Sequence, residues 1–282
     1  MKVFAIDLSK CNGCYNCQVS CKDEFVGNDW PPYSLSEPDI GQFWMKVVEK
    51  ESGTAPKLQV AFVPQLCEHC DDAPCMKAAL NGAIYKRSDG MVIIDPVLSV
   101  GQKQLVPACP YGAIYWNATL NIPQKCTACA HILDNATIAG GILTPRCAYD
   151  CPTKAIVFGD DTDPAMQALM SQGEVLHPEY GTKPRVYYLN TPKPFIAGAL
   201  ADPVADECIE GASVSATDLT TGTVYSTTSD IYGDFWFSGL DSNRSYELSI
   251  TKAGYTSRKM MVFLGATDSK NVGDIMLLAE SS

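Results

Sequence analysis

The residues best placed to do chemistry are cysteines, and all but Cys208 of the thirteen fall within the first 151 positions. The first run has the C-x2-C-x2-C-x3-C spacing of iron–sulfur ligands and consists of Cys11, Cys14, Cys17 and Cys21. In such a run three thiolates on one tight loop hold one cluster, and the fourth points away and reaches a second cluster. The spacing therefore predicts [4Fe–4S] clusters that are shared between runs.

Three further runs follow, and they differ in how many ligand positions are cysteine. The second run has Ala79 at its fourth position, and the third keeps only Cys109. Both end in Gly-Ala-Ile-Tyr, at residues 82–85 and 112–115, which marks them as internal repeats of one unit. The cysteines of the second and fourth runs are Cys67, Cys70 and Cys75, and Cys126, Cys129, Cys147 and Cys151.

The missing cysteines indicate which runs share clusters, because the fourth cysteine of each run serves the cluster of its partner run. Pairing the first run with the second would leave Cys151 unused, and pairing the first with the third would leave Cys21 unused. Pairing the first with the fourth and the second with the third uses every cysteine of the four runs. The predicted ligands are Cys11, Cys14, Cys17 and Cys151 at site 1; Cys126, Cys129, Cys147 and Cys21 at site 2; and Cys67, Cys70, Cys75 and Cys109 at site 3. A fourth site would have no thiolate, since it would draw on Ser99, Gln102, Leu105 and Ala79.

Two other uses of cysteine compete with this interpretation. Disulfide frameworks are typical of short secreted chains, and paired C-x2-C motifs also bind structural zinc. Iron–sulfur ligation is favoured because the spacings match it in detail. Cys208, which stands apart from the runs, is interpreted as a small loop residue rather than a redox thiol.

Charge and hydropathy exclude other classes of protein. The chain has 32 acidic and 21 basic side chains, and its net charge of -11 argues against a nucleic-acid-binding surface. No apolar run approaches the roughly 18 residues of a membrane helix, so no membrane span is expected. The first ligand, Cys11, leaves no room for a signal peptide. We therefore expect a cytoplasmic protein, unless the signal of a partner exports both chains.

Short apolar stretches between the cysteine runs predict strands that flank the ligand loops. These stretches are residues 3–6, 60–63, 83–85, 91–94, 113–116 and 155–158. Asp89 and Gly90 predict a hairpin turn between two of them. The pattern predicts an α+β fold in which residues 1–162 form a duplicated two-cluster ferredoxin-like domain with long insertions such as 23–60. Because three clusters leave little apolar core, we expect the metals to supply much of the stability.

The segment 163–195 is expected to join this domain to the rest of the chain. It begins with a predicted helix that has Asp163 as its N-cap. From residue 173 it is rich in Gly, Pro and Tyr, which predicts an extended linker on a surface. Tyr187 and Tyr188 are interpreted as packing against their own chain rather than against a partner.

Residues 196–282 change character, because cysteine nearly vanishes and Thr, Ser and Val alternate with turn signals. This pattern predicts six or seven antiparallel strands in an all-β sandwich. The stretch TTSDIYGDFWFSGL resembles the T-D-x-x-G-x-F turn of transthyretin-like or carboxypeptidase regulatory-like domains, with Asp230, Gly233 and Phe235 at matching positions. Asp230 and Asp234 are interpreted as setting this turn rather than binding calcium.

The cluster region as a whole resembles the iron–sulfur electron-transfer subunits of the dimethyl sulfoxide reductase superfamily of molybdenum or tungsten pterin enzymes. The resemblance rests on the four nested runs, on the K-C-x-x-C-x-H motif from Lys125 to His131, and on C-P-T from Cys151 to Thr153. Members of this family normally hold four clusters. The loss of one site, the segment GTKPRVYYLN and the appended sandwich resemble the subunits of transhydroxylases that act on hydroxylated aromatic rings.

This resemblance implies a heterodimer in which a large partner subunit carries molybdopterin guanine dinucleotide with molybdenum or tungsten and performs the substrate chemistry. The present chain would relay electrons through three [4Fe–4S] clusters and would contain no catalytic residue. Of its histidines, His69 and His131 lie beside cluster ligands, where an imidazole either donates to a cluster sulfur or packs at the surface, and His177 lies elsewhere. The alternatives are a free multi-cluster ferredoxin, or the iron–sulfur subunit of another such enzyme, for example a phenol hydroxylase or dehydroxylase.

Overall fold

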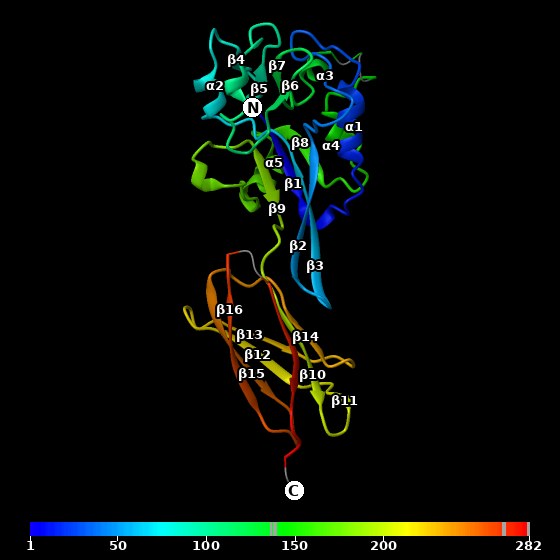
Figure 1. Ribbon diagram of the computed structural model, residues 1–282, viewed down its shortest axis with the longest axis vertical. Coiled ribbons are helices and arrows are strands. Elements are labelled where there is room, and N and C mark those ends of the chain that lie inside the picture. The colour runs from blue at the N-terminus through cyan, green and yellow to red at the C-terminus, as the bar shows by residue number, and fades with distance from the viewer. Residues whose placement is uncertain (136, 138–139, 267–268, 281–282) are drawn as a thin grey trace. The chain divides into compact units, whose positions relative to one another are not determined.

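The computed structural model describes residues 1–135, 137, 140–266 and 269–280 (Figure 1). The chain forms two compact units, each with its own apolar core. Unit 1 consists of Met1–Glu49 and Phe62–Thr191, and unit 2 consists of Lys50–Ala61 and Pro192–Ser282. In the described part of the chain no helix is long and apolar enough to cross a membrane.

Unit 1 contains a three-stranded sheet of order β8–β1–β9. Strand β1 (Lys2–Asp7) pairs antiparallel with β8 (Ile156–Asp160) and parallel with β9 (Val186–Leu189). Helix α5 (Pro164–Gln172) packs beside β1 and β9, as Figure 1 shows. Asp163 is its N-cap, as predicted, and its side chain accepts a backbone N–H of the first turn.

The two faces of β1 have different partners, because successive side chains of a strand point to opposite sides of the sheet. Val3 and Ala5 pack with Met166 of α5 in a small cluster. Phe4 and Ile6 belong to the main core of unit 1, which also contains most of the cysteines. The sheet therefore supports the cysteine loops from one side.

Two short helices bring distant cysteines together in unit 1. Helix α1 (Asn16–Phe25) packs against helix α4 (Arg146–Tyr149). Cys17 and Cys21 lie four residues apart on one face of α1 and are both buried, whereas Val19 between them is exposed. The x3 spacing thus places the third and fourth cysteines of the first run on the inner side of the helix.

Two antiparallel hairpins follow the second and third cysteine runs. One pairs β4 (Ile84–Lys86) with β5 (Val92–Ile94), and the other pairs β6 (Tyr115–Asn117) with β7 (Ile122–Gln124). The first hairpin turns at Gly90, which has a positive φ, as the sequence predicts. The remaining short helices of unit 1 are η1 (Leu8–Lys10), α2 (Pro74–Ala78), η2 (Lys103–Leu105), α3 (Ala130–Asp134) and η3 (Pro178–Tyr180).

The repeated Gly-Ala-Ile-Tyr segments have similar backbones. Gly82 precedes β4 with φ at 68°, and Gly112 precedes β6 with φ at 63°. Glycine is the residue that adopts this left-handed region without steric cost. The two repeats therefore make the same kind of turn before entering their strands.

Strands β2 (Lys46–Thr54) and β3 (Lys57–Gln65) form a two-stranded arm whose tip belongs to unit 2. Lys57 at this tip forms an ion pair with Asp234. The sequence predicts only a strand at 60–63 here, within a long insertion. The arm is longer than predicted because its outer half packs on residues from the other end of the chain.

Unit 2 is a sandwich of two four-stranded sheets. In one sheet β10 lies between β14 and β17 and also pairs with β11, and the other has the order β13–β12–β15–β16. Alternate side chains of β15, at Tyr246, Leu248 and Ile250, are fully buried between the sheets. The strands are β10 (Ile196–Asp202), β11 (Glu207–Cys208), β12 (Ser213–Asp218), β13 (Val224–Thr228), β14 (Asp234–Phe237), β15 (Arg244–Thr251), β16 (Arg258–Leu264) and β17 (Lys270–Met276).

The predicted turn before β14 is formed by the expected residues. Asp230 accepts backbone hydrogen bonds from Tyr232 and Asp234, both at 2.9 Å, which confirms that it sets the turn. Gly233 has φ at 75°, and a Cβ at this position would lie 2.3 Å from the carbonyl oxygen of Leu200. Only glycine fits such a close backbone approach.

Two expectations for the second half of the chain are wrong. The expected linker over 173–195 instead contains strand β9, although Tyr188 of this strand is buried within its own chain as expected. In the sandwich, β17 pairs with β10 in parallel, so the strands are not all antiparallel. Both differences arise from pairing between segments far apart in the chain, which local composition does not reveal.

Candidate iron–sulfur centres

The four cysteines of predicted site 3 line one cavity, and about 330 Å³ of space free of protein atoms lies in it and at its mouth. Cys75 lies on the short helix α2, and the other two early cysteines lie in the loop that precedes it. Cys109 enters from the next repeat, and its Sγ accepts a hydrogen bond from the backbone N–H of Ala113 at 3.5 Å. The cavity is thus closed by the second and third runs together.

The cysteines of predicted site 1 also share a cavity, of about 290 Å³. Cys11 and Cys14 lie in the loop before α1, and Cys17 lies in its first turn. Cys151 follows α4 and brings its sulfur within 3.6 Å of the hydroxyl oxygen of Thr153. The first and fourth runs therefore meet around this space.

The cysteines of predicted site 2 are all buried, with 7 % or less of each residue exposed. Cys21 reaches this group from α1 and Cys147 from α4, which pack against each other. Burial raises the pKa of Cys21 well above its usual value, and the nearby thiols of Cys126 and Cys129 add to the effect. Burial also raises the pKa of Cys147, and its neighbouring thiols add to the effect.

The position of a fourth site is filled by packed side chains. Leu105 is fully buried in an apolar cluster in which Ala79 also takes part. Gln102 accepts from the backbone N–H of Leu80 at 2.9 Å and donates to the carbonyl oxygens of Leu80 and Leu98. At the missing ligand positions, Gln102 therefore bridges the two repeats by hydrogen bonds, and Leu105 fills the space between them.

Most of the buried thiols hold their protons more tightly than free cysteine does. Burial raises the pKa of Cys17 and Cys70 to about 12, and that of Cys75 and Cys126 to about 11. Burial also acts to raise the pKa of Cys151, but several backbone N–H donors outweigh it and lower the pKa. Because metal ligands must be thiolates, binding of iron at these sites would displace protons.

The donor set and the cavities fit [4Fe–4S] clusters. All thirteen cysteines of the chain are free, and four of them from two runs line each of the two cavities. Each iron of such a cluster takes one thiolate, so the four donors must surround a volume rather than converge on a point. Within the described residues, no three His, Cys, Asp or Glu side chains gather closely enough to hold a single metal ion.

Both histidines beside the ligands are buried rather than exposed. His69 accepts the backbone N–H of Val92 at its Nδ1, at 3.0 Å, so its proton lies on Nε2, which has no hydrogen-bond partner among the described atoms. His131 pairs through Nε2 with Glu24 at 2.8 Å and stacks on Trp30 at 4.3 Å between ring centroids. A buried N–H without a partner is costly, and a cluster sulfur is an acceptor of the kind that it needs.

Lys125 is a buried cation beside the predicted sites, with 2 % of the residue exposed. It lines the site 3 cavity. Burial acts to lower its pKa, but the thiols of Cys67, Cys75 and Cys126 outweigh burial and raise the pKa.

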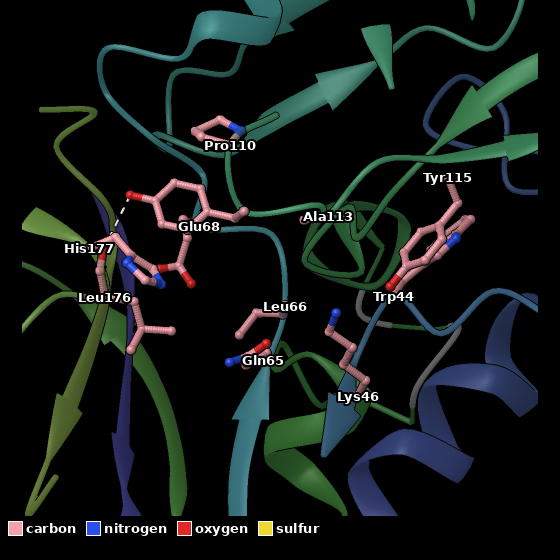
Figure 2. A pocket seen from close by; sticks show the side chains of 11 residues that line it. Trp44, Lys46, Gln65, Leu66, Glu68, Pro110, Ala113, Tyr115, Leu176 and His177 are labelled. Carbon is pink, nitrogen blue, oxygen red and sulfur yellow. Dashed lines mark hydrogen bonds between the residues drawn. The ribbon is translucent and has the colours of Figure 1, made fainter. Parts of the chain in front are cut away.

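A further pocket lies in unit 1 beside the loop that carries Cys109, and no cysteine lines it. Figure 2 shows Trp44 and Tyr115 on one side of this pocket and His177 on the other. Between them lies the carboxyl group of Glu68, of which Oε2 has no hydrogen-bond partner in the described chain. Burial raises the pKa of Glu68 to about 8.

Sequence reasoning missed the charged groups that are buried around the sites. Lys125 entered only as part of a motif, and Glu68 and Glu24 did not enter at all. The sequence did contain a signal for Lys125 and Glu68, because each stands directly beside a predicted cysteine ligand in a loop that must be buried. Glu24 could not have been found, since its pairing with His131 joins residues far apart in the chain.

Two family models match the chain. The 4Fe–4S dicluster domain matches residues 58–161, and the carboxypeptidase regulatory-like domain matches residues 196–278. The first match contains all the cysteines of the second, third and fourth runs. The second confirms the resemblance drawn from the turn before β14.

Several iron–sulfur and small subunits are similar to this chain. The small subunit of pyrogallol hydroxytransferase from Pelobacter acidigallici is 41% identical over 88% of this chain and 90% of its own length. A sulfite dehydrogenase subunit from Allochromatium vinosum is 36% identical over 65% of this chain and 80% of its own length. The iron–sulfur subunit of arsenate respiratory reductase from a Shewanella strain is 31% identical over 66% of this chain and 94% of its own length. These matches and the cysteine geometry show that the chain belongs to the family of iron–sulfur electron-transfer subunits of molybdopterin enzymes, which includes the small subunit of pyrogallol hydroxytransferase.

Proposed function

We propose that this chain is the electron-transfer subunit of a heterodimeric enzyme of the transhydroxylase type that acts on hydroxylated aromatic rings. Sites 1, 2 and 3 would each hold one [4Fe–4S] cluster, and a large partner subunit would carry molybdopterin guanine dinucleotide with molybdenum or tungsten. The convergence of four cysteines on each of two cavities supports this proposal, and so does the burial of the other four where α1 packs against α4. Each cluster, when bound, supplies one-electron transfer, and the chain's own residues hold and bury it.

The extent of the sequence matches favours the transhydroxylase type over other enzymes of the family. The match to the pyrogallol hydroxytransferase subunit spans 88% of the chain, whereas the sulfite dehydrogenase and arsenate reductase subunits match about two thirds. Unit 2, which begins its main segment at Pro192, is needed to account for the longer match. A free multi-cluster ferredoxin would leave this unit without an evident role.

The experiment that tests the proposal is anaerobic purification of the tagged chain together with its partners. We expect a large subunit that contains molybdenum or tungsten to co-purify, and about twelve irons per chain, four from each of three clusters. Sixteen irons would contradict the closed fourth site. Iron-loaded chain that purifies alone at every salt concentration would favour the free ferredoxin instead.

The closed fourth site fits a reaction in which no net electrons leave the complex. Transhydroxylation moves a hydroxyl group between two rings, so electrons taken from one ring return to the other. Gln102 and Leu105 fill the position where a fourth cluster would extend the electron path. During turnover we expect no reduction of an added one-electron acceptor. Reduction in proportion to product formed would show that the clusters supply an external carrier.

A further inference from the structure

Lys125 occupies a position between two of the predicted cluster sites. It follows β7 directly and precedes Cys126, a predicted ligand of site 2. Its Nζ donates to the carbonyl oxygen of Cys126 at 2.9 Å and to that of Val92. The same side chain lines the site 3 cavity together with Cys67, Cys70, Cys75 and Cys109. One ammonium group is thus shared by two sites.

The charge of Lys125 has no acidic partner among the described residues, which distinguishes it from Lys22, Lys86 and Arg185 of unit 1. Lys22 pairs with Glu37 at 3.2 Å. Arg185 pairs with Asp71 at 2.6 Å, and Lys86 pairs with the same carboxylate at 2.7 Å. None of the ion pairs between described residues includes Lys125. A buried ammonium group is costly unless an anion compensates it.

The sulfur atoms around Lys125 are the remaining source of negative charge. Lys125 lines one cavity together with Cys67 and Cys75 of site 3, and it is bonded to the backbone of Cys126 of site 2. A [4Fe–4S] cluster bound by four thiolates is negatively charged, and reduction adds one more negative charge. A cation held nearby therefore stabilises the reduced form more than the oxidised form.

We propose that Lys125 is a positioning residue that supplies one shared positive charge to sites 2 and 3 and raises the reduction potential of both clusters. This inference rests on the proposed function, because it requires clusters at both sites. Electrons would then be held preferentially on this pair, while site 1, whose cavity is lined by other residues, would keep its own potential. The alternative is that Lys125 only ties two loops together through the carbonyl oxygens of Val92 and Cys126.

Potentiometric titration of the intact complex, followed by electron paramagnetic resonance, distinguishes these roles. The test variant is Lys125→Met, which keeps the length of the side chain and removes its charge. For both sites we expect the equilibrium constant for reduction to fall about tenfold, which is about 59 mV for a one-electron couple. Lys125→Arg keeps the charge, and its potentials should stay closer to those of the wild type. The signals are assigned with Cys151→Ser for site 1, Cys21→Ser for site 2 and Cys109→Ser for site 3.

Lys86→Met is the matched control. Lys86 donates to the carbonyl oxygen of Cys70 at 3.0 Å, so it also lies next to site 3, but Asp71 compensates its charge. Its removal should shift the potential of site 3 much less than the removal of Lys125 does. Unchanged potentials in Lys125→Met with full iron content would overturn the proposal, and so would equal shifts at all three sites.

A measurement on the wild-type complex covers the case in which Lys125→Met loses a cluster. Protein labelled with nitrogen-15 at the lysine side chains is reduced and examined for a hyperfine coupling between the label and the cluster spins. We expect a coupling that disappears in unlabelled protein and persists in labelled Lys86→Met. If it is absent, or is lost in Lys86→Met, the proposal fails. If the wild-type complex does not contain three clusters, the proposed function fails instead.

Discussion

The proposed role of Cys109 depends on the second cysteine run and not on the third run, to which Cys109 belongs. The three positions before it in its run are Ser99, Gln102 and Leu105, none of which is a thiol. The sulfur of Cys109 lines the same cavity as the three cysteines of the second run. In the proposed arrangement Cys109 is kept although the rest of its own run has no cysteine, because its bond would belong to the site of the second run.

Replacement of Cys109 by alanine should damage site 3 alone. We expect the iron content to fall by about four atoms per chain, or by about one if a three-iron cluster remains. Iron analysis and electron paramagnetic resonance of the oxidised complex would detect either result. Cys208→Ala is the control, since Cys208 is exposed on β11 and should leave the iron content unchanged. Loss of the site 1 or site 2 signal in Cys109→Ala would contradict the pairing of runs.

Among the secondary-structure elements, the β2–β3 arm depends most on distant parts of the chain. Its tip contributes Ser52, which shares a hydrogen bond with Ser269, in addition to the ion pair of Lys57. Gly53 at the tip has φ at 90°, and a Cβ there would lie 2.5 Å from both the carbonyl oxygen of Lys57 and the ring of Phe195. The tip is therefore an integral part of unit 2.

The substitution Gly53→Ala should destabilise unit 2. The left-handed backbone costs about 1 kcal/mol for alanine, and the two close contacts add about 2 kcal/mol more. Hydrogen exchange of β10 and β14 would report the free energy of unfolding. Gly222→Ala is the matched control, because Gly222 also has a positive φ in unit 2 but has no atom within 4 Å of the added Cβ. Equal effects of the two substitutions would show that the tip does not pack as described.

At the scale of the whole molecule, the two units differ in what holds them together. Unit 2 has a continuous apolar core between its two sheets. The main core of unit 1 includes many of the cysteines themselves, together with side chains of β1 and of the helices α1 and α4. Removal of the metals should therefore affect one unit and spare the other.

Anaerobic removal of iron with a chelator should unfold much of unit 1 while unit 2 stays folded. Free buried thiols cannot replace the bonds that tie the cysteine loops together. Hydrogen exchange with mass spectrometry should show rapid exchange in α1 and α4 and unchanged protection in β12 and β15. Re-addition of iron and sulfide should restore protection in unit 1. Full protection of α1 without iron would mean that the apolar core alone holds this unit.

The cysteine spacing by itself predicts three complete sites and a partner for each run, and these remain predictions. The prediction is possible because ligand geometry is local and its rule for sharing clusters is strict. The helix that begins after Asp163 and the turn at Asp230 and Gly233 were also predicted, since caps and tight turns depend on a few neighbouring residues. The family resemblance followed from the same motifs.

Only the tertiary structure revealed the features that join distant segments. Strand β9 pairs with β1, and β17 pairs in parallel with β10, because strand pairing depends on residues brought together by folding. The arm tip belongs to unit 2 for the same reason. The burial of Lys125 and the lack of a hydrogen-bond partner for Nε2 of His69 are known only from the structure. The free energy of burying a polar group depends on the groups that surround it.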